Sequence, residues 1–293
     1  MTQQEMKSPM RQLLIGAIVA ISLSACVQQG DRRESPGDLV TLSIVGTNDI
    51  HGQFMPRENR GGVTTLSGYV NALRNARSED GGLLLIDGGD MWQGSLESNL
   101  NEGALMTEVF NAMGYAASTI GNHEFDFGPA GKDAIPVKPS DDPREVLKLR
   151  AKEASFPLLA ANLLDAATGE RVAWDNIMPA TIVEVAGIRI GIIGILTRST
   201  PLTTIPANVV GLRIAPLTET IVHEARALRS KGADLVIVTA HAGGRCDDLS
   251  DPRDISSCDL SREILAVANS LPPGLVDVIN GGHEDNALAH IVN

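Results

Sequence analysis

Short apolar runs of strand-forming residues alternate along this chain with amphipathic stretches of helical period. The runs include residues 83–86 (LLLI) and 156–161, whereas residues 217–229 repeat apolar side chains every three or four positions. Strands that alternate with helices are typical of sheets covered by helices, so the pattern predicts an α/β fold. An apolar stretch over residues 181–196 is interrupted by an Ala-Gly pair, which predicts a hairpin and therefore mixed sheets.

Polar clusters follow five of the predicted strands directly. In chain order they contain Asp49 and His51, Asp90, Asn122 and His123, His241, and His283. Ligands of α/β proteins bind beyond the carboxyl ends of strands, so these side chains are expected to meet at one site. Four of the 6 His residues lie in the clusters, and burying so many polar groups without a purpose would be costly. We interpret the other two, His223 and His290, as ordinary surface or packing residues.

The clusters form recognisable blocks. TNDIHGQF, IDGGDMWQGS, GNHEFD, AHAGG and GGH follow one another in this order. Together they resemble the metallophosphoesterase domain of the 5′-nucleotidase/UDP-sugar hydrolase family, over a stretch from about Val40 to the last residue. The resemblance implies an α/β metallophosphoesterase β-sandwich of mixed sheets flanked by helices. It also implies an enzyme that hydrolyses phosphate monoesters of nucleotides by attack of a metal-bound hydroxide.

The resemblance assigns a role to each residue of the clusters. It implies two divalent metal ions bridged by Asp90. It implies five terminal ligands, the first two on one ion and the last three on the other: Asp49, His51, Asn122, His241 and His283. His123 would face the scissile phosphate without binding metal, and Asp126 would orient it. Mixed imidazole, carboxylate and amide ligands favour Zn, Mn, Co or Fe over Ca or Mg.

The last block departs from the family pattern. The family usually has Gly-His-x-His or Gly-His-x-Gln there, whereas this chain has Gly282-His283-Glu284-Asp285. We expect Asp285 to serve as a metal ligand, which would add negative charge to the site. Two alternatives stay open, namely that Glu284 substitutes for it or that the site is weakened.

The end of the chain is the second departure. Family members continue with further strands and a C-terminal nucleotide-binding domain, whereas this sequence ends at Asn293. Residues 40–293 are therefore expected to form a metallophosphoesterase domain truncated before completion, without the nucleotide-binding domain. Alternative activities on the same site are those of a cyclic-nucleotide phosphodiesterase, a sugar-nucleotide pyrophosphatase or a thiosulfohydrolase. A further alternative is an inactive metal-binding lipoprotein fragment.

The N-terminus has the features of an export signal. A basic segment is followed by the apolar residues 13–23 and by Leu-Ser-Ala-Cys, which resembles a bacterial lipobox. We predict a lipoprotein signal peptide over residues 1–25, lipidation of Cys26 and a flexible tether over residues 26–39. An ordinary signal peptide is the alternative. The predicted location is the bacterial cell envelope, lipid-anchored on the periplasmic or outer-surface side. Val27 weakly favours the outer membrane.

Export predicts an oxidising compartment, in which Cys246 and Cys258 are expected to form a disulfide. Two free thiols or a metal-binding pair are the alternatives. The formal net charge of −12 argues against nucleic acid as a partner. A small phosphorylated substrate, expected to be a nucleotide, remains compatible because bound metal ions reverse the local field.

Overall fold

The computed structural model describes residues 39–58, 60–284 and 286–292. The predictions for residues 1–38, which include lipidation of Cys26, and for Asp285 lie outside the described residues. The strands are β1 (Thr41–Thr47), β2 (Gly81–Asp87), β3 (Ala117–Thr119), β4 (Leu158–Leu159), β5 (Leu163–Asp165), β6 (Ile177–Met178), β7 (Ala180–Val185), β8 (Ile188–Leu196), β9 (Leu212–Ile214), β10 (Leu235–His241) and β11 (Val278–Gly281). The helices are α1 (Gly62–Ala76), α2 (Leu96–Asn99), α3 (Ala104–Met113), α4 (Glu145–Glu153), α5 (Thr200–Thr203), α6 (Leu217–Ser230) and α7 (Glu263–Ser270), with short 3₁₀ turns η1 (His123–Phe125) and η2 (Pro206–Asn208).

Two larger sheets carry the fold. The first has the order β1-β2-β3-β4-β6 and is parallel throughout. The second has the order β11-β10-β8-β7, in which β7 alone is antiparallel because it forms the predicted hairpin with β8. Strands β5 and β9 form a separate antiparallel pair.

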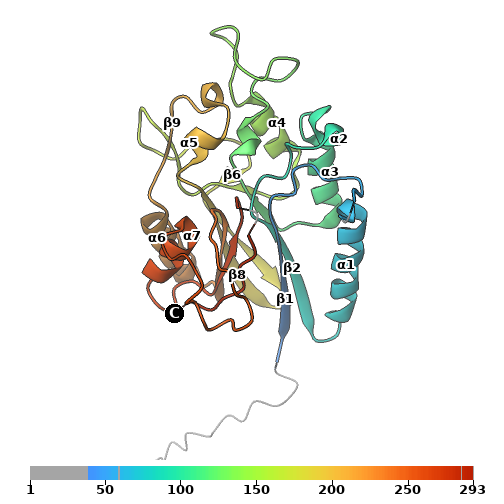
Figure 1. The fold of residues 1–293 in the computed structure, drawn as a ribbon, viewed down its shortest axis with the longest axis vertical. Helices are drawn as coiled ribbons and strands as arrows, with labels where there is room; N and C mark the ends of the chain where they lie inside the picture. The colour runs from blue at the N-terminus through green and yellow to red at the C-terminus, as the bar shows by residue number, and fades with distance from the viewer. Residues whose placement is uncertain (1–38, 59, 285, 293) are drawn as a thin grey trace, which may run out of the picture. The chain divides into compact units, whose positions relative to one another are not determined.

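Alternating side chains on the strands bury both faces of each sheet. On β2, Leu84 and Ile86 point between the two sheets, whereas Leu85 faces α1, α3 and α4. On β10, Ile237 lies between the sheets, whereas Val238 packs against α6 and α7. Figure 1 shows α1 and α3 on one side of the sheets and α6 and α7 on the other. The predicted β-sandwich flanked by helices is thereby confirmed, with one parallel sheet and one mixed sheet.

One predicted strand is much shorter than expected. Of residues 156–161, only Leu158 and Leu159 pair with neighbouring strands. The next residues leave the first sheet, because Ala161 donates its N–H to the carbonyl of Gly194 on β8 at 2.8 Å. The apolar run resembles one strand in sequence, although the chain crosses between the two sheets within it.

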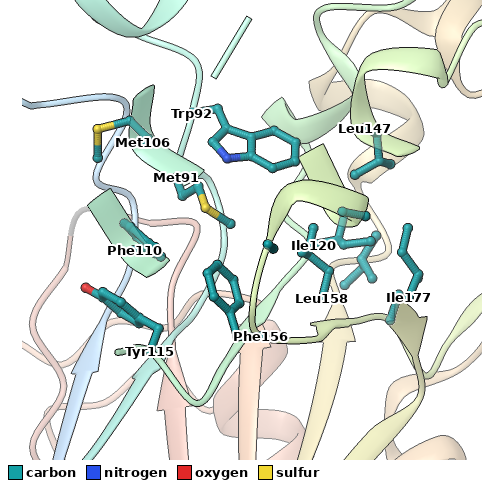
Figure 2. Packing of buried hydrophobic residues seen from close by; sticks show 14 of the residues in the cluster. Met91, Trp92, Met106, Phe110, Tyr115, Ile120, Leu147, Phe156, Leu158 and Ile177 are labelled. Atoms are coloured by element: carbon teal, nitrogen blue, oxygen red, sulfur yellow. The ribbon is translucent and has the colours of Figure 1, made fainter. Parts of the chain in front are cut away.

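The aromatic residues concentrate beside the first sheet. The rings of Phe110 and Tyr115 stack with centroids 3.9 Å apart. Figure 2 shows the side chains of Met91 and Trp92 in this same cluster. Both are fully buried and directly follow Asp90 in the chain. The core thereby anchors the loop that carries a predicted metal ligand.

Asp87 is a fully buried carboxylate at the end of β2. It accepts hydrogen bonds from the hydroxyls of Thr47 on β1 at 2.7 Å and of Ser118 on β3 at 2.8 Å, and from the N–H of Gly89 at 2.9 Å. Burial raises the pKa of Asp87 to about 7, outweighing the hydrogen bonds that lower it. The unfolded chain therefore loses this proton before the folded chain does.

Replacing Asp87 with Asn should remove part of the pH dependence of stability. An amide keeps the geometry, because its oxygen accepts from Ser118 and Gly89 while its nitrogen donates to Thr47. In the parent chain, the Asp87 contribution lowers stability as pH rises from about 4 to about 7, since the unfolded state binds fewer protons in that window.

Chemical denaturation across a pH series tests this expectation. Asp87→Asn should raise the free energy of unfolding at pH 8 by roughly 1–4 kcal/mol and leave it nearly unchanged at pH 4. Equal destabilisation of the variant at every pH would show that Asp87 is not kept protonated by burial.

Candidate metal centre

Five parallel strands deliver the candidate site residues to adjoining edges of the two sheets. Strands β1, β2 and β3 end at one edge of the first sheet, and β10 and β11 end at one edge of the second. The two edges are joined where the Nδ1 atom of His241 lies 2.9 Å from the carbonyl oxygen of Gly88. Residues that are up to 234 positions apart in sequence therefore meet, as in the 2.8 Å hydrogen bond from the backbone N–H of His283 to the Asp49 carboxylate.

Asp90 is the centre of the arrangement. Ligand atoms of Asp90, His241 and His283 lie within 4.8 Å of one another, and so do those of Asp49, His51 and Asp90. One Asp90 oxygen lies 3.1 Å from Nε2 of His241 and 3.9 Å from Nε2 of His51. Membership of both groups is the position that a bridging carboxylate requires.

The candidate ligands turn lone pairs toward one another. The Nδ1 atom of His51 lies 2.9 Å from the carbonyl of Gln93, and that of His241 has the same contact with Gly88. A nitrogen beside a carbonyl donates, so in the neutral form of each ring Nε2 is the nitrogen that carries the lone pair, and it faces the site. The amide nitrogen of Asn122 donates to a backbone carbonyl at 2.8 Å, which leaves its oxygen 2.9 Å from Nε2 of His241.

This donor set fits divalent metal ions. Imidazole nitrogens, carboxylates and an amide oxygen surround one region, all of them acceptors. Among the ion pairs of residues 39–58, 60–284 and 286–292, none joins a Lys or Arg to Asp49 or Asp90. The negative charge of these two carboxylates is therefore not neutralised by a Lys or Arg side chain.

The backbone at the site adopts conformations that are rare for residues other than glycine. Four candidate ligands have positive φ: Asp49 (47°), His51 (49°), Asp90 (57°) and His283 (76°). Such conformations cost about 1–3 kcal/mol each and cluster at functional sites. Gly89 beside them also has no room for a side chain, because a Cβ atom there would lie 2.8 Å from the backbone nitrogen of Gly121.

Burial and neighbouring charges shift the pKa values of three candidate ligands. Burial lowers the pKa of His241, but its hydrogen bond to Asp90 and the nearby carboxylate charges outweigh burial and raise the pKa to about 9. Burial raises the pKa of Asp49. Burial also lowers the pKa of His283, and the charge of His241 lowers it further. Ligands must lose their protons to bind metal, so a cation would take the place of the proton held between His241 and Asp90.

His123 and Asp126 form a pair beside the candidate ligands. The Nδ1 atom of His123 lies 2.5 Å from an oxygen of Asp126, whose other oxygen accepts a hydrogen bond from the Thr204 hydroxyl at 2.7 Å. The hydrogen bond that His123 donates to Asp126 raises the pKa of His123 against the opposing effect of burial. Because the His123 side chain is 30% exposed, a substrate can reach it.

Glu124 belongs to one of the polar clusters of the sequence, but no role was predicted for it. Its buried carboxylate accepts hydrogen bonds from the backbone N–H groups of Asp90 at 2.9 Å, Met91 at 2.8 Å and Gly121 at 2.6 Å. Burial and the charge of Asp90 raise its pKa to about 7. Glu124 therefore holds together the loops that carry Asp90 and Asn122. Only its place in the GNHEFD block could have drawn attention to it.

Replacing Glu124 with Gln should disturb this support. The new amide group would turn two N–H donors toward backbone N–H donors, leaving buried groups unpaired. We expect the free energy of unfolding, measured by chemical denaturation, to fall by roughly 1–3 kcal/mol. The same exchange at the exposed Glu170 should have almost no effect. An unchanged stability for Glu124→Gln would show that these hydrogen bonds contribute little.

The remaining predicted residues lie outside this cluster. Cys246 and Cys258 are joined by a disulfide with an S–S distance of 1.97 Å, so neither is a free thiol or a metal ligand in this structure. Glu284, considered as a substitute ligand, pairs instead with Arg262 at 3.0 Å. His223 is exposed on α6, as expected for a surface residue.

A scan against models of protein families finds no match. A 5′-nucleotidase of Vibrio cholerae is 30% identical to this chain over 285 residues, which cover 95% of this chain and 46% of that protein. A solved structure of a 5′-nucleotidase precursor from Thermus thermophilus superposes with a TM-score of 0.61 at 28% identity, covering 82% of this chain and 41% of that one. This chain is a relative of the 5′-nucleotidases. The resemblance predicted from the sequence blocks is thereby confirmed.

The comparisons also show which fold the chain shares and how much of the relatives' length it covers. A calcineurin-like phosphoesterase from Bacillus subtilis, at 22% identity and a TM-score of 0.62, shares the fold. The chain spans less than half the length of the 5′-nucleotidase relatives. Across the part of the chain that the structure describes, no helix has both the length and the apolar character of a membrane span.

Proposed function

We propose that this chain is a metal-dependent phosphoester hydrolase that releases phosphate from small phosphorylated substrates, with nucleotide 5′-monophosphates as the expected class. The observation that supports this proposal most directly is the position of Asp90. It belongs to two groups of candidate ligands, and the partly buried His123–Asp126 pair lies beside both. Metal binding alone does not require that pair.

We assign the metal site to the residues that converge there. Asp90 would be shared by two divalent ions. Asp49 and His51 would hold one ion, and Asn122, His241 and His283 would hold the other, with Asp285 as an additional candidate. Zn, Mn, Co or Fe suits this donor set. When bound, two such ions would activate water and polarise phosphoryl oxygens.

The remaining steps belong to residues of this chain. Asp126 accepts a hydrogen bond from Nδ1 of His123 and so turns Nε2 away from itself. The raised pKa of His123 favours the imidazolium. Its Nε2–H stabilises charge on a phosphoryl oxygen and donates a proton to the leaving alkoxide as the P–O bond breaks. The buried Asp90 and His241 hold the other side of the site rigidly.

The cellular location is part of the same proposal. Residues 1–25 act as a lipoprotein signal peptide, Cys26 carries the lipid, and residues 26–39 tether the domain to the envelope surface. The basic and apolar segments before Cys26 support export. The disulfide between Cys246 and Cys258 suits an oxidising compartment.

Phosphate release tests the proposed activity. The chain from Val27 onward would be assayed with AMP and with p-nitrophenyl phosphate, each with Mn²⁺ or Zn²⁺ and with a chelator. Chelator-sensitive release from AMP is the expected result. Release from p-nitrophenyl phosphate alone would keep the hydrolase and reject nucleotides as its substrate class. No release from folded, metal-loaded protein would overturn the proposal.

Replacing His123 with Ala should separate catalysis from metal binding. Because His123 is not assigned as a ligand, metal content by elemental analysis should stay at the parent value. The rate of phosphate release should fall by roughly 10²–10⁴-fold. The exposed His223→Ala is the matched control and should keep the parent rate. Loss of metal from His123→Ala would show instead that His123 binds an ion.

A further inference from the structure

Each histidine of the candidate metal site has a partner for its second ring nitrogen, but the partners differ. His51 and His241 donate directly to backbone carbonyls, of Gln93 and Gly88. His283 instead places Nε2 3.2 Å from the hydroxyl oxygen of Ser199. A hydroxyl both donates and accepts, so this contact alone does not determine which nitrogen of His283 carries the proton.

The hydroxyl of Ser199 belongs to a chain of hydrogen bonds that ends on a carboxylate. Ser199 Oγ lies 2.9 Å from Oγ1 of Thr197, and Oγ1 of Thr197 lies 2.6 Å from Oε2 of Glu263. The other oxygen of Glu263 accepts from the N–H of Arg198 at 3.0 Å. The carboxylate is therefore held at both oxygens by the segment that follows β8.

A carboxylate accepts only, and this fixes the direction of the chain. Thr197 donates its proton to Glu263, so the two lone pairs of its oxygen accept from the backbone N–H of Ser199 at 3.1 Å and from the Ser199 hydroxyl. Ser199 then donates to Thr197 and accepts from Nε2–H of His283. Nδ1 of His283 keeps its lone pair, and Nδ1 is the atom that lies 3.1 Å from Nε2 of His241 within the candidate metal site.

The Ser199 hydroxyl has no competing structural duty. Ser199 precedes the short helix α5 at the position where a serine commonly caps the backbone, yet its side chain makes no capping hydrogen bond. Thr197 is 1% exposed, so water does not substitute for its partners. Glu263 begins helix α7, where a negative charge is favoured by the helix dipole.

We infer that Glu263, acting through Thr197 and Ser199, is a positioning residue that sets the tautomer of His283 and presents Nδ1 to the metal. The inference rests on the proposed function in one respect, namely that His283 is a ligand. Carboxylates that orient ligand histidines are a general feature of metal sites, and here two hydroxyls extend the connection. The relay (Glu263, Thr197 and Ser199) lies outside all five sequence blocks.

Two substitutions at Thr197 form a matched pair. Thr197→Val keeps the shape of the side chain and removes the hydroxyl, whereas Thr197→Ser keeps the hydroxyl. Calorimetric titration with Mn²⁺ should show two ions bound by the parent chain. Thr197→Val should weaken one of them by roughly 10–100-fold and leave the other unchanged. Thr197→Ser should restore the parent affinity, and melting curves would verify that both variants fold.

Glu263→Gln gives a second measurement that needs no metal. The amide oxygen of Gln accepts from Arg198, so its nitrogen donates to Thr197 and reverses the chain. Ser199 would then donate to Nε2 of His283, and the proton would move to Nδ1. Nitrogen NMR shifts of His283 should therefore report an Nε2–H tautomer in the parent chain and an Nδ1–H tautomer in Glu263→Gln.

The two measurements separate the relay from the proposed function. Equal Mn²⁺ affinities for the parent chain and Thr197→Val would overturn the relay while leaving the metal site intact. An unchanged His283 tautomer in Glu263→Gln would overturn it as well. A parent chain that binds no Mn²⁺ would reject the proposed metal site, and the NMR comparison would still decide whether the relay fixes the tautomer.

Discussion

The junction between β10 and the end of β2 is the contact on which the rest of the site depends. On the inner face of β10, Thr239 donates to the carbonyl of Asp87 at 2.7 Å, and Nδ1 of His241 contacts the next carbonyl, that of Gly88, at 2.9 Å. Strand alternation extends the apolar row of Ile237 into these two polar residues. These two contacts hold the ligand-bearing ends of the two sheets next to each other.

The fold buries several carboxyl groups close together at this site, and their burial is unfavourable when they are charged. Asp87, Asp90 and Glu124 are all buried. Asp87 and Asp90 are close in sequence, and Glu124 accepts a hydrogen bond from the backbone N–H of Asp90. Asp87 and Glu124 have pKa values of about 7 because burial penalises their charge, whereas the neighbouring His241 has a pKa of about 9. A divalent cation would compensate the buried negative charge, so metal binding is expected to increase the free energy of unfolding.

The sequence predicted the sheets, the helices and the site cluster for a common reason: all three appear as local patterns. Buried strands are apolar runs, and the residues around Asp90 occur in short blocks. The predicted strand over residues 156–161 is present but shorter, because the chain passes from one sheet to the other within the apolar run. The roles of Glu124 and of the relay were not predicted, since their contacts join distant parts of the chain; Ser199 and His283 are 84 residues apart.

The positive φ angles at Asp49, His51, Asp90 and His283 restrict how this site can change over evolutionary time. A β-branched residue at any of these positions would carry the strain of a left-handed backbone besides the loss of a ligand. Asn tolerates this conformation well. Exchange of Asp for Asn is therefore the least disruptive path of drift, and it would lower the charge of the site before it altered the site's shape.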